Sequence, residues 1–344
     1  MGRWTQFVLR HRVAVVCIWA VVLLAGGYAS SKLPPLLSNT FSVPGTDSER
    51  VRSLLERHFG DRPDGSFTAV FRVRDSGDPA VVARLQAAVA GAAAAVPTGK
   101  PTTLNVAGPH VVFGDVVSTL RLADAKGYTD DVLRALGAPR GAQHTYVTGA
   151  GPIQHDLDPI FDEDLKHGEL LIALPIALLI LLLVFGLSFA VTIPLLFAAC
   201  TIEGTLGILY GIAHLAQTPT YTTNLVQLIG LGIAVDYSLL IVYRFREELG
   251  HGLDVDAAIV RTMQTAGRAV VFSGIAVALG LALLLAMPLP FMRMMGVAGF
   301  LIPIVSMLAA VTLQPALLSL YGRRGVARKR LLPGEPVDPE HGFW

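Results

Sequence analysis

An acid and a phenol stand side by side inside one long apolar stretch. Asp236 and Tyr237 lie within residues 222–249, TTNLVQLIGLGIAVDYSLLIVYRFREEL. About 20 apolar residues rising 1.5 Å each cross the roughly 30 Å hydrocarbon core of a bilayer, and residues 222–243 reach that length. An aspartate at the centre of such a helix costs about 2.5 to 3.5 kcal/mol, so acids at this depth commonly mark ion or proton pathways. We therefore predict that both residues form a proton relay. The alternative is that Asp236 pairs with a buried partner and only fixes helix packing.

Two glycines share helical faces with this pair. At 100° per residue, Gly232 falls within about 40° of Asp236, and Gly230 falls within about 20° of Tyr237. A helix that lacks side chains at such points lets a neighbouring helix approach closely, so we predict close packing at both glycines. Glu203 is a second acid in an apolar stretch. It is a candidate for a second relay or a substrate gate, and the alternative is a glutamate that is hydrogen-bonded in the bundle for structure.

Three motifs around the relay extend this interpretation. They are G-L-G-I-A-V-D-Y-S at 230–238, R-F-R-E-E at 244–248 and T-A-G-R-A-V-V-F-S-G at 265–274. Together they resemble the fourth and fifth transmembrane helices of MMPL (mycobacterial membrane protein large) transporters, which belong to the resistance-nodulation-division superfamily. The resemblance implies export of lipids or other hydrophobic compounds across the plasma membrane, driven by protons. Its expected partners are membrane lipids, a hydrophobic substrate and protons.

The chain departs from the family pattern in one respect. Members usually carry twelve spans in two similar halves, with the relay joining the fourth span of one half to its equivalent in the other. Six spans are predicted here, in the order of a first half, so a second six-helix half from a second copy or another chain is expected to complete it. The alternatives are an inactive half-transporter fragment, or a non-pumping lipid-binding or scaffold protein of the sterol-sensing type, which would not need a titratable group in the membrane.

Composition also indicates a membrane protein. Of 344 residues, 53% are hydrophobic and only 15% are charged, whereas soluble domains carry about 25% charged residues. The net charge of +1 gives no indication of nucleic-acid binding. The histidines and the two cysteines lack the spacing of metal ligands, and no catalytic constellation is visible. We therefore expect no metal, no cofactor and no enzyme activity.

Six apolar stretches are long enough to cross a bilayer. They predict a mainly α, six-helix transmembrane bundle with helices at 13–31, 169–187, 190–212, 222–243, 269–287 and 291–320, the last broken or kinked near Pro303. In domain terms, the membrane part is residues 13–31 and 169–320.

The arginines predict the orientation of these spans. They gather in the N-terminal tail 1–12, in the loop after the fourth span and in the proline-rich tail 321–344. Basic residues favour the cytoplasmic side, so we predict a multi-pass plasma-membrane protein with both termini in the cytoplasm. Within the loop, residues 254–268 place apolar side chains at helical spacing, which predicts an amphipathic helix on the inner membrane surface.

Residues 32–168 then lie outside the cytoplasm. Apolar periodicity predicts a helix at 47–60 and another at 79–97, an alternating strand at 66–74, strands at 102–107 and 115–122, a helix at 129–136 and a strand at 143–148. The order β-α-β-β-α-β after the first helix is that of an α/β ferredoxin-like domain. It is also the fold that the family resemblance implies for a porter domain between the first and second spans.

Overall fold

The first residues form two helices that meet at His11. The computed structural model describes residues 1–37, 45–59, 63–186 and 188–326. Helix α1 (Gly2–Arg10) gives the expected basic tail a regular structure, and α2 (Arg12–Ser31) is a 20-residue apolar helix. Two prolines follow, and the chain continues as a short 3-10 turn, η1 (Pro34–Leu36), because proline lacks the N–H that would extend α2.

A small antiparallel sheet with helices follows the first long helix. Its elements are α3 (Asp47–Phe59), η2 (Pro63–Gly65), β1 (Phe67–Val73), α4 (Pro79–Ala94), β2 (Lys100–Pro101), β3 (Asn105–Gly108), β4 (Val111–Val117), α5 (Leu122–Ala125), η3 (Lys126–Tyr128), α6 (Thr129–Leu136) and β5 (Ala142–Thr148). The strand order is β2-β4-β1-β5, and β3 also pairs with β4. Every pairing is antiparallel. Because β1 pairs with both β4 and β5, it lies between them.

Alternation along β1 builds the core of this sheet. Phe67, Ala69, Phe71 and Val73 are buried, and the residues between them are partly or fully exposed. Their buried face packs against α4, whose N-terminus is capped where the Asp78 carboxylate accepts from the N–H of Ala80. The predicted strand 66–74 is thereby confirmed. The strand predicted at 115–122 is present as β4 but spans Val111–Val117, because the hairpin turn falls earlier than predicted.

Long apolar helices make up most of the remaining chain. They are α7 (Ala150–Leu165), the π-helix η4 (Lys166–Ala173), α8 (Leu174–Phe185), η5 (Phe189–Val191), α9 (Thr192–Ala213), α10 (Tyr221–Gly250), α11 (Val255–Ala282), η6 (Leu283–Ala286), α12 (Pro290–Val311) and α13 (Leu313–Val326). Within the described residues, five helices are long and apolar enough to cross a membrane: Arg12–Ser31, Phe189–Ala213, Tyr221–Gly250, Val255–Ala286 and Pro290–Gly322.

Three expected boundaries differ from the structure. The span predicted at 169–187 is present as a shorter apolar helix, Leu171–Phe185, which continues α7 through η4. The surface helix predicted at 254–268 and the span predicted at 269–287 form one continuous helix, α11. The last span runs through Pro303 without ending and breaks instead at Thr312, whose backbone is not helical. Residues 327–344 of the predicted tail lie outside the described residues.

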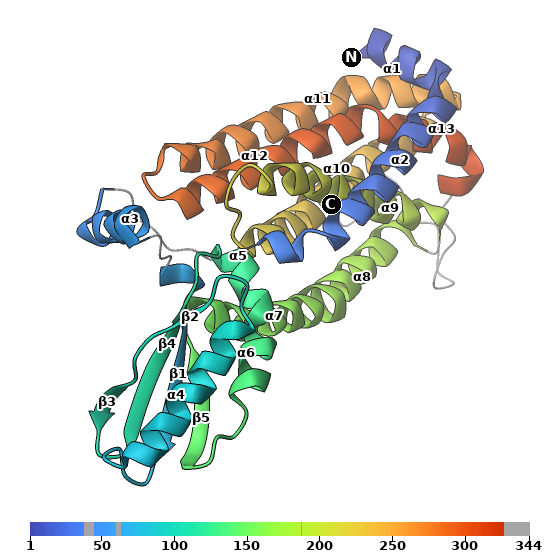
Figure 1. Ribbon diagram of the computed structural model, residues 1–344. Coiled ribbons are helices and arrows are strands. Elements are labelled where there is room, and N and C mark those ends of the chain that lie inside the picture. The colour runs from blue at the N-terminus through green and yellow to red at the C-terminus, as the bar shows by residue number, and fades with distance from the viewer. Residues whose placement is uncertain (38–44, 60–62, 187, 327–344) are drawn as a thin grey trace.

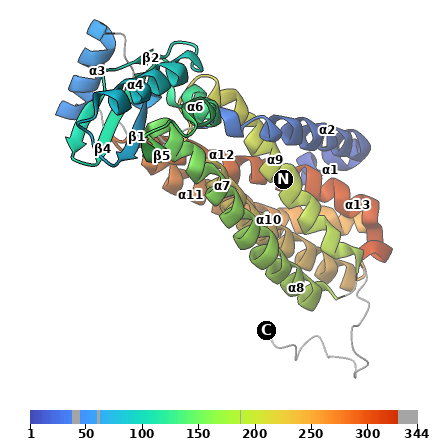
Figure 2. The same ribbon diagram turned by 60° about the horizontal axis from the view of Figure 1, so that its bottom comes forward.

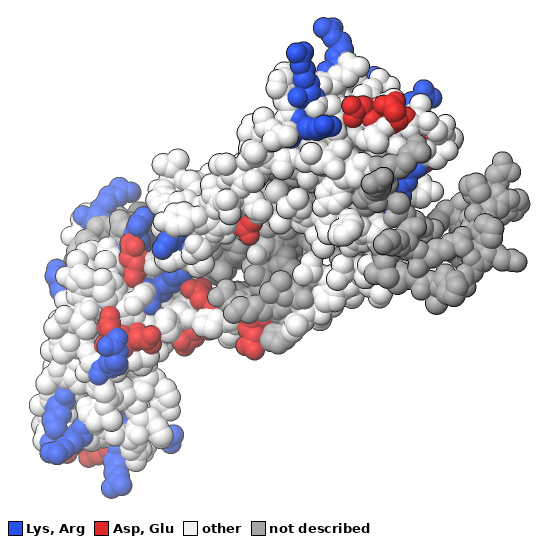
Figure 3. All heavy atoms as spheres, turned by 90° about the vertical axis from the view of Figure 1, so that its right-hand side faces the viewer, with Lys and Arg blue, Asp and Glu red and all other residues white. Residues whose placement is uncertain are grey.

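The helices and the sheet form two ends of the molecule. In Figure 1 the sheet and α4 lie at the lower left, and α1 lies at the opposite end, beside α11 and α13. Figure 2 shows α10 beside α9, α11 and α12, and α8 at the edge of this bundle. In Figure 3, Lys, Arg, Asp and Glu gather on the sheet end and on the α1 end, and a largely uncharged band lies between them. This charge distribution is the one expected of a protein that crosses a bilayer.

Candidate functional site

Asp236 lies on an open face of α10. Its side chain is exposed in this chain, and within the described residues it has no hydrogen bond or ion pair. Helix α10 places it about four turns after the N-terminal Tyr221 and about four turns before Gly250. Within the described residues, Asp236 therefore lacks the buried partner that the helix-packing alternative requires. Its carboxylate faces the surface that surrounds the helices.

Tyr237 points the other way, into the bundle. Its side chain is 8% exposed, and its hydroxyl lies 3.4 Å from the position that a Cβ on Gly274 of α11 would take. The buried hydroxyl has no hydrogen-bond partner in the described chain. Consecutive residues of a helix differ by about 100° in direction. The structure therefore separates Asp236 and Tyr237 onto different faces of α10 and does not bring their side chains together.

The two glycines of α10 differ in the same way. A Cβ at Gly230 would lie 2.8 Å from Ile202 Cγ1 and 3.0 Å from Ile302 Cδ1, so this glycine lets α9 and α12 approach closely. A Cβ at Gly232 would meet nothing within 4 Å. Gly230 therefore belongs to the packed face of α10, and Gly232 belongs to the open face.

The open face of α10 is continuous along the helix. Leu228 is 65% exposed, Leu240 is 42% exposed and Tyr243 is 56% exposed, and Gly232 and Asp236 lie between them. These residues are spaced by four, four, four and three positions, which keeps them on one side of a helix. We refer to them as the open stripe. Its combination of large apolar side chains, a glycine and one acid resembles a helix interface without its partner.

Glu203 is placed very differently from Asp236. It lies on α9, where its carboxylate Oε2 accepts a 2.7 Å hydrogen bond from the hydroxyl of Ser30 at the end of α2. The two helices touch here, since a Cβ on Gly26 would lie only 2.3 Å from the carbonyl oxygen of Glu203. Glu203 also lines a cavity of about 240 Å³, together with Asp158 of α7 and Gln227 of α10.

A buried lysine lies close to this cavity. Lys126 is 8% exposed, and its ammonium group donates to the carbonyl oxygens of Pro34 and Leu37 at 3.2 and 2.9 Å. It also forms an ion pair with Asp158 at 2.8 Å. Lys126 thus ties the sheet domain to the segment after α2 and to α7. No sequence motif marks this residue, because its partners are far away along the chain.

A second buried polar contact lies inside the helix bundle. The fully buried Gln314 of α13 donates from Nε2 to the hydroxyl of Ser238 at 2.8 Å, and that hydroxyl is one position beyond Tyr237. Gln314 and Ser238 thereby satisfy each other's polar groups, and unpaired polar groups would be costly in an apolar helix bundle. The predicted site did not include either residue, although each is a polar residue in a predicted span and could have been found that way.

The R-F-R-E-E motif ends α10 in charged contacts. Arg244 pairs with Glu247 at 2.7 Å and with the buried Glu248 at 2.6 Å. Arg246 donates to the carbonyl oxygen of Phe185 at 3.1 Å and stacks over its ring at 4.8 Å. The Arg246 contacts connect the end of α10 to the end of α8. Within the described residues, no group of three or more His, Cys, Asp or Glu side chains could hold a metal ion.

The apolar helices and the small sheet define a multi-pass membrane protein. Residues 114–344 match the MMPL family. The chain is 37% identical over 327 residues to a membrane protein of Streptomyces coelicolor, covering 92% of this chain and 46% of that protein. It therefore belongs to the MMPL family of the resistance-nodulation-division superfamily.

Two further relatives carry functional names. The chain is 30% identical over 346 residues to MmpL3 of Mycobacterium leprae, named as a trehalose monomycolate exporter, with coverage of 93% of this chain and 36% of that protein. It is 28% identical over 359 residues to MmpL11 of Mycobacterium tuberculosis, named as a heme uptake protein, with coverage of 100% and 37%. The chain thus spans between a third and a half of the length of these three relatives.

Proposed function

We propose that this chain forms the first half of a transporter that moves lipids or other hydrophobic compounds outward across the plasma membrane, driven by protons that Asp236 takes up and releases. The observation that carries the proposal is the open stripe of α10, with an unpartnered acid at its centre. Relatives named for the transport of a mycolate lipid and of heme support a hydrophobic cargo.

The open stripe is where a second half would pack. An exposed acid flanked by lipid would be costly, because a carboxylate in hydrocarbon lacks water and partners. A second six-helix half that covers Leu228, Gly232 and Leu240 would enclose Asp236 and offer it groups to exchange protons with. Tyr237 lies behind this contact, so its role is to set the packing of α10 against α11 and only indirectly the state of Asp236.

The architecture supports a six-helix half with an external domain. We propose that the external domain is ferredoxin-like, and the strand order β4-β1-β5 with β3 outside β4 supports this. The continuous helix α7-η4-α8 carries the apolar segment Leu171–Phe185, which we propose as the second span. With six spans both termini lie on one side, and the arginines near α1, α10 and α11 favour the cytoplasm for that side.

Single cysteines test this orientation. In a background without Cys17 and Cys200, we expect a cysteine at Ser76 to react with an impermeant maleimide applied from outside the cell. A cysteine at Gly250 should react only after the membrane is opened. Labelling of both positions in intact cells would contradict the proposed topology.

An apolar route for the substrate follows from the energy available. One charge that falls through 100 mV yields roughly 2.3 kcal/mol, whereas moving a bare sixteen-carbon chain into water costs on the order of 13 kcal/mol at about 0.8 kcal/mol per CH₂. Protons therefore cannot drag such a chain through water. We propose that the cargo moves through the outer leaflet and the crevices of the external domain.

Reconstitution with the second half tests the relay. Asp236→Asn keeps the side-chain volume but cannot ionise, so proton flux and export should both be lost while the protein remains in the membrane. Asp236→Glu should retain part of both activities, and Tyr237→Phe should be impaired less than Asp236→Asn. Glu247→Gln, on the same helix but in a charged end, serves as the control and should transport normally.

A second candidate is a lipid-binding scaffold of the sterol-sensing type that does not pump. Such a protein would bind lipid without moving protons. If Asp236→Asn still exports substrate against a gradient with proton movement intact, the relay is wrong. If the wild-type protein binds lipid but neither exports it nor moves protons, the scaffold is right.

A further inference from the structure

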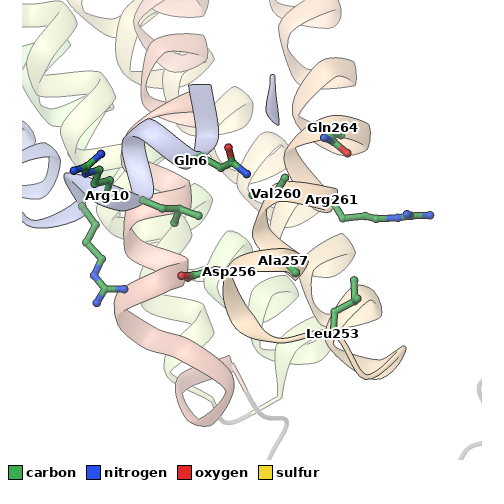
Figure 4. A pocket seen from close by; sticks show the side chains of 10 residues that line it. Gln6, Arg10, Leu253, Asp256, Ala257, Val260, Arg261 and Gln264 are labelled. Carbon is green, nitrogen blue, oxygen red and sulfur yellow. The ribbon is translucent and has the colours of Figure 1, made fainter. Parts of the chain in front are cut away.

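A groove separates α1 from the start of α11. It has a volume of about 810 Å³, and its polar lining consists of Gln6, Arg10, Arg12, Asp256, Arg261 and Gln264. Figure 4 shows Gln6 and Arg10 on the side of α1 and Asp256, Ala257 and Arg261 on α11, with the Arg261 side chain pointing away from Arg10. Helix α1 is held close to α11 at one end, since a Cβ on Gly2 would lie 2.7 Å from the amide nitrogen of Gln264. The volume is within the range of about 300 to 1,000 Å³ that small ligands occupy.

The charges of this groove favour an anion. Three arginines line it against one acid, Asp256. Arg10 has no hydrogen bond or ion pair in the described part of the chain, and Arg12 uses Nη1 to donate to the hydroxyl of Ser319 at 2.7 Å. Arg261 is 67% exposed at the rim, where its Nε lies 3.8 Å from Glu248. Most guanidinium donors therefore remain available, and guanidinium groups match phosphate oxygens in geometry.

The groove opens where the membrane surface would be. Arg12 is the first residue of the apolar helix α2, and Val13 and Ile18 of that helix are more than 60% exposed. On α1 itself, Trp4 is 47% exposed and Phe7 is 55% exposed, and Arg3, Gln6 and Arg10 of the same helix are exposed as well. Aromatic side chains on an amphipathic helix favour the interface between headgroups and acyl chains.

We propose that this groove binds the phosphate headgroup of an anionic phospholipid from the leaflet at the α1 end, with its acyl chains beside Val13 and Ile18 of α2. Arg10 and Arg12 hold the phosphate, Gln6 and Gln264 donate to the remaining oxygens, and Arg261 at the rim adds positive charge that attracts the headgroup. A soluble phosphate would gain the same polar contacts but would not use the apolar surface next to them. The site therefore selects a lipid. This inference does not depend on the proposed transport.

Native mass spectrometry of the purified full chain tests the site. The protein is released from micelles that contain equal amounts of phosphatidylglycerol and phosphatidylcholine, and the ratio of the two lipid adducts is measured. The wild-type protein should retain one phosphatidylglycerol preferentially. Each basic residue near a lipid surface contributes about 1 kcal/mol, so Arg10→Gln and Arg261→Gln should each lower the ratio roughly fivefold. Asp256→Asn should raise it, because it removes the only acid of the lining.

Controls separate this site from a diffuse basic surface. Arg3→Gln removes an exposed arginine of the same helix that does not line the groove, and it should leave the ratio unchanged. Circular dichroism and size-exclusion chromatography show that each variant is folded. If Arg3→Gln lowers the ratio as much as Arg10→Gln, or if Asp256→Asn does not raise it, the groove is not the site. If glycerol 3-phosphate forms the adduct as readily as phosphatidylglycerol, the site binds soluble anions and the lipid proposal is wrong.

Discussion

The packed and the open faces of α10 each present a glycine and a polar side chain, but the two pairs have different surroundings. On the packed face, Gly230 lets α9 and α12 pack close against α10, and Tyr237 fills space beside Gly274 of α11. On the open face, Gly232 meets nothing and Asp236 has no partner within the described chain. The glycine and the polar residue on the packed face therefore make contacts within this chain, whereas those on the open face make none within the described residues.

The contact between α2 and α9 shows the tightest version of the packed face. Gly26 and Gly27 are neighbours in the sequence, but a Cβ at Gly26 would lie 2.3 Å from the backbone oxygen of Glu203, and one at Gly27 would meet nothing within 4 Å. A backbone atom cannot move aside as a side chain can. Small residues at such crossings allow membrane helices to pack by van der Waals contact.

Gly26→Ala should have the largest effect on stability. Because its methyl group would collide with the backbone of α9, we expect a loss of about 3 kcal/mol in the free energy of unfolding. Gly27→Ala is the matched control and should be neutral or stabilising by up to about 1 kcal/mol, since alanine favours a helix over glycine. Thermal unfolding in detergent, followed by tryptophan fluorescence, measures both. Equal melting temperatures for the two variants would contradict this helix contact.

The two glycines of α10 should give a smaller difference. Gly230→Ala would press a methyl group against the side chains of Ile202 and Ile302, which can shift in part, so we expect a loss of about 1 to 2 kcal/mol. Gly232→Ala should not destabilise the chain.

Gly232→Leu sharpens the comparison by adding bulk to the open stripe. It should leave the melting temperature of this chain unchanged but weaken its association with a second half in a pull-down from membranes. If Gly232→Leu lowers the melting temperature of the chain alone as Gly230→Ala does, then the face is already packed and the stripe is not open.

Hydropathy predicted the helices better than their boundaries. The stretches around α2, α9 and α10 were predicted from length and composition because a bilayer requires about 20 apolar residues. The join within α11 was missed because the pattern changes from one-sided to uniformly apolar near residue 268, although the helix runs on through Gly267 and no proline there interrupts its backbone hydrogen bonds. The start of β4 was missed because the turn at Gly108 and Pro109 was not used to place the hairpin.

The sequence predicted which residues belong to the candidate site, but not the helix face on which each side chain lies. Asp236 and Glu203 were found because acids are rare in apolar helices. An almost uniformly apolar helix gives no sequence signal for which of its faces is covered, so the exposure of Asp236 could not be predicted. The contacts of Lys126 with Pro34, Leu37 and Asp158 span tens of residues of sequence and follow only from the fold.

Removing the hydroxyl of Ser30 should have a modest effect. Ser30→Ala deletes the 2.7 Å hydrogen bond to Glu203, and because this pair is only partly buried we expect a loss of about 1 kcal/mol. Ser31→Ala is the control, since Ser31 lines the same cavity but donates to the carbonyl oxygen of Tyr28. A double-mutant cycle with Glu203→Gln measures the coupling. Strict additivity of the two changes would show that the hydrogen bond contributes nothing.

Among these substitutions, Asp236→Asn should change the stability of this chain least. Its carboxylate contacts no partner within the described residues, so Asp236→Asn should change the free energy of unfolding by no more than about 0.5 kcal/mol. Tyr237→Phe should also be tolerated, because it removes a buried hydroxyl that has no hydrogen-bond partner here. The same melting-temperature assay measures both variants, and a loss of more than about 1 kcal/mol for Asp236→Asn would mean that the carboxylate already has a structural partner. A carboxylate without a partner in its own chain is costly in a membrane. Under the proposed function, contacts with a second half offset that cost. The assay on the isolated chain and the transport assay with a second half should therefore give opposite rankings for Asp236 and Gly26.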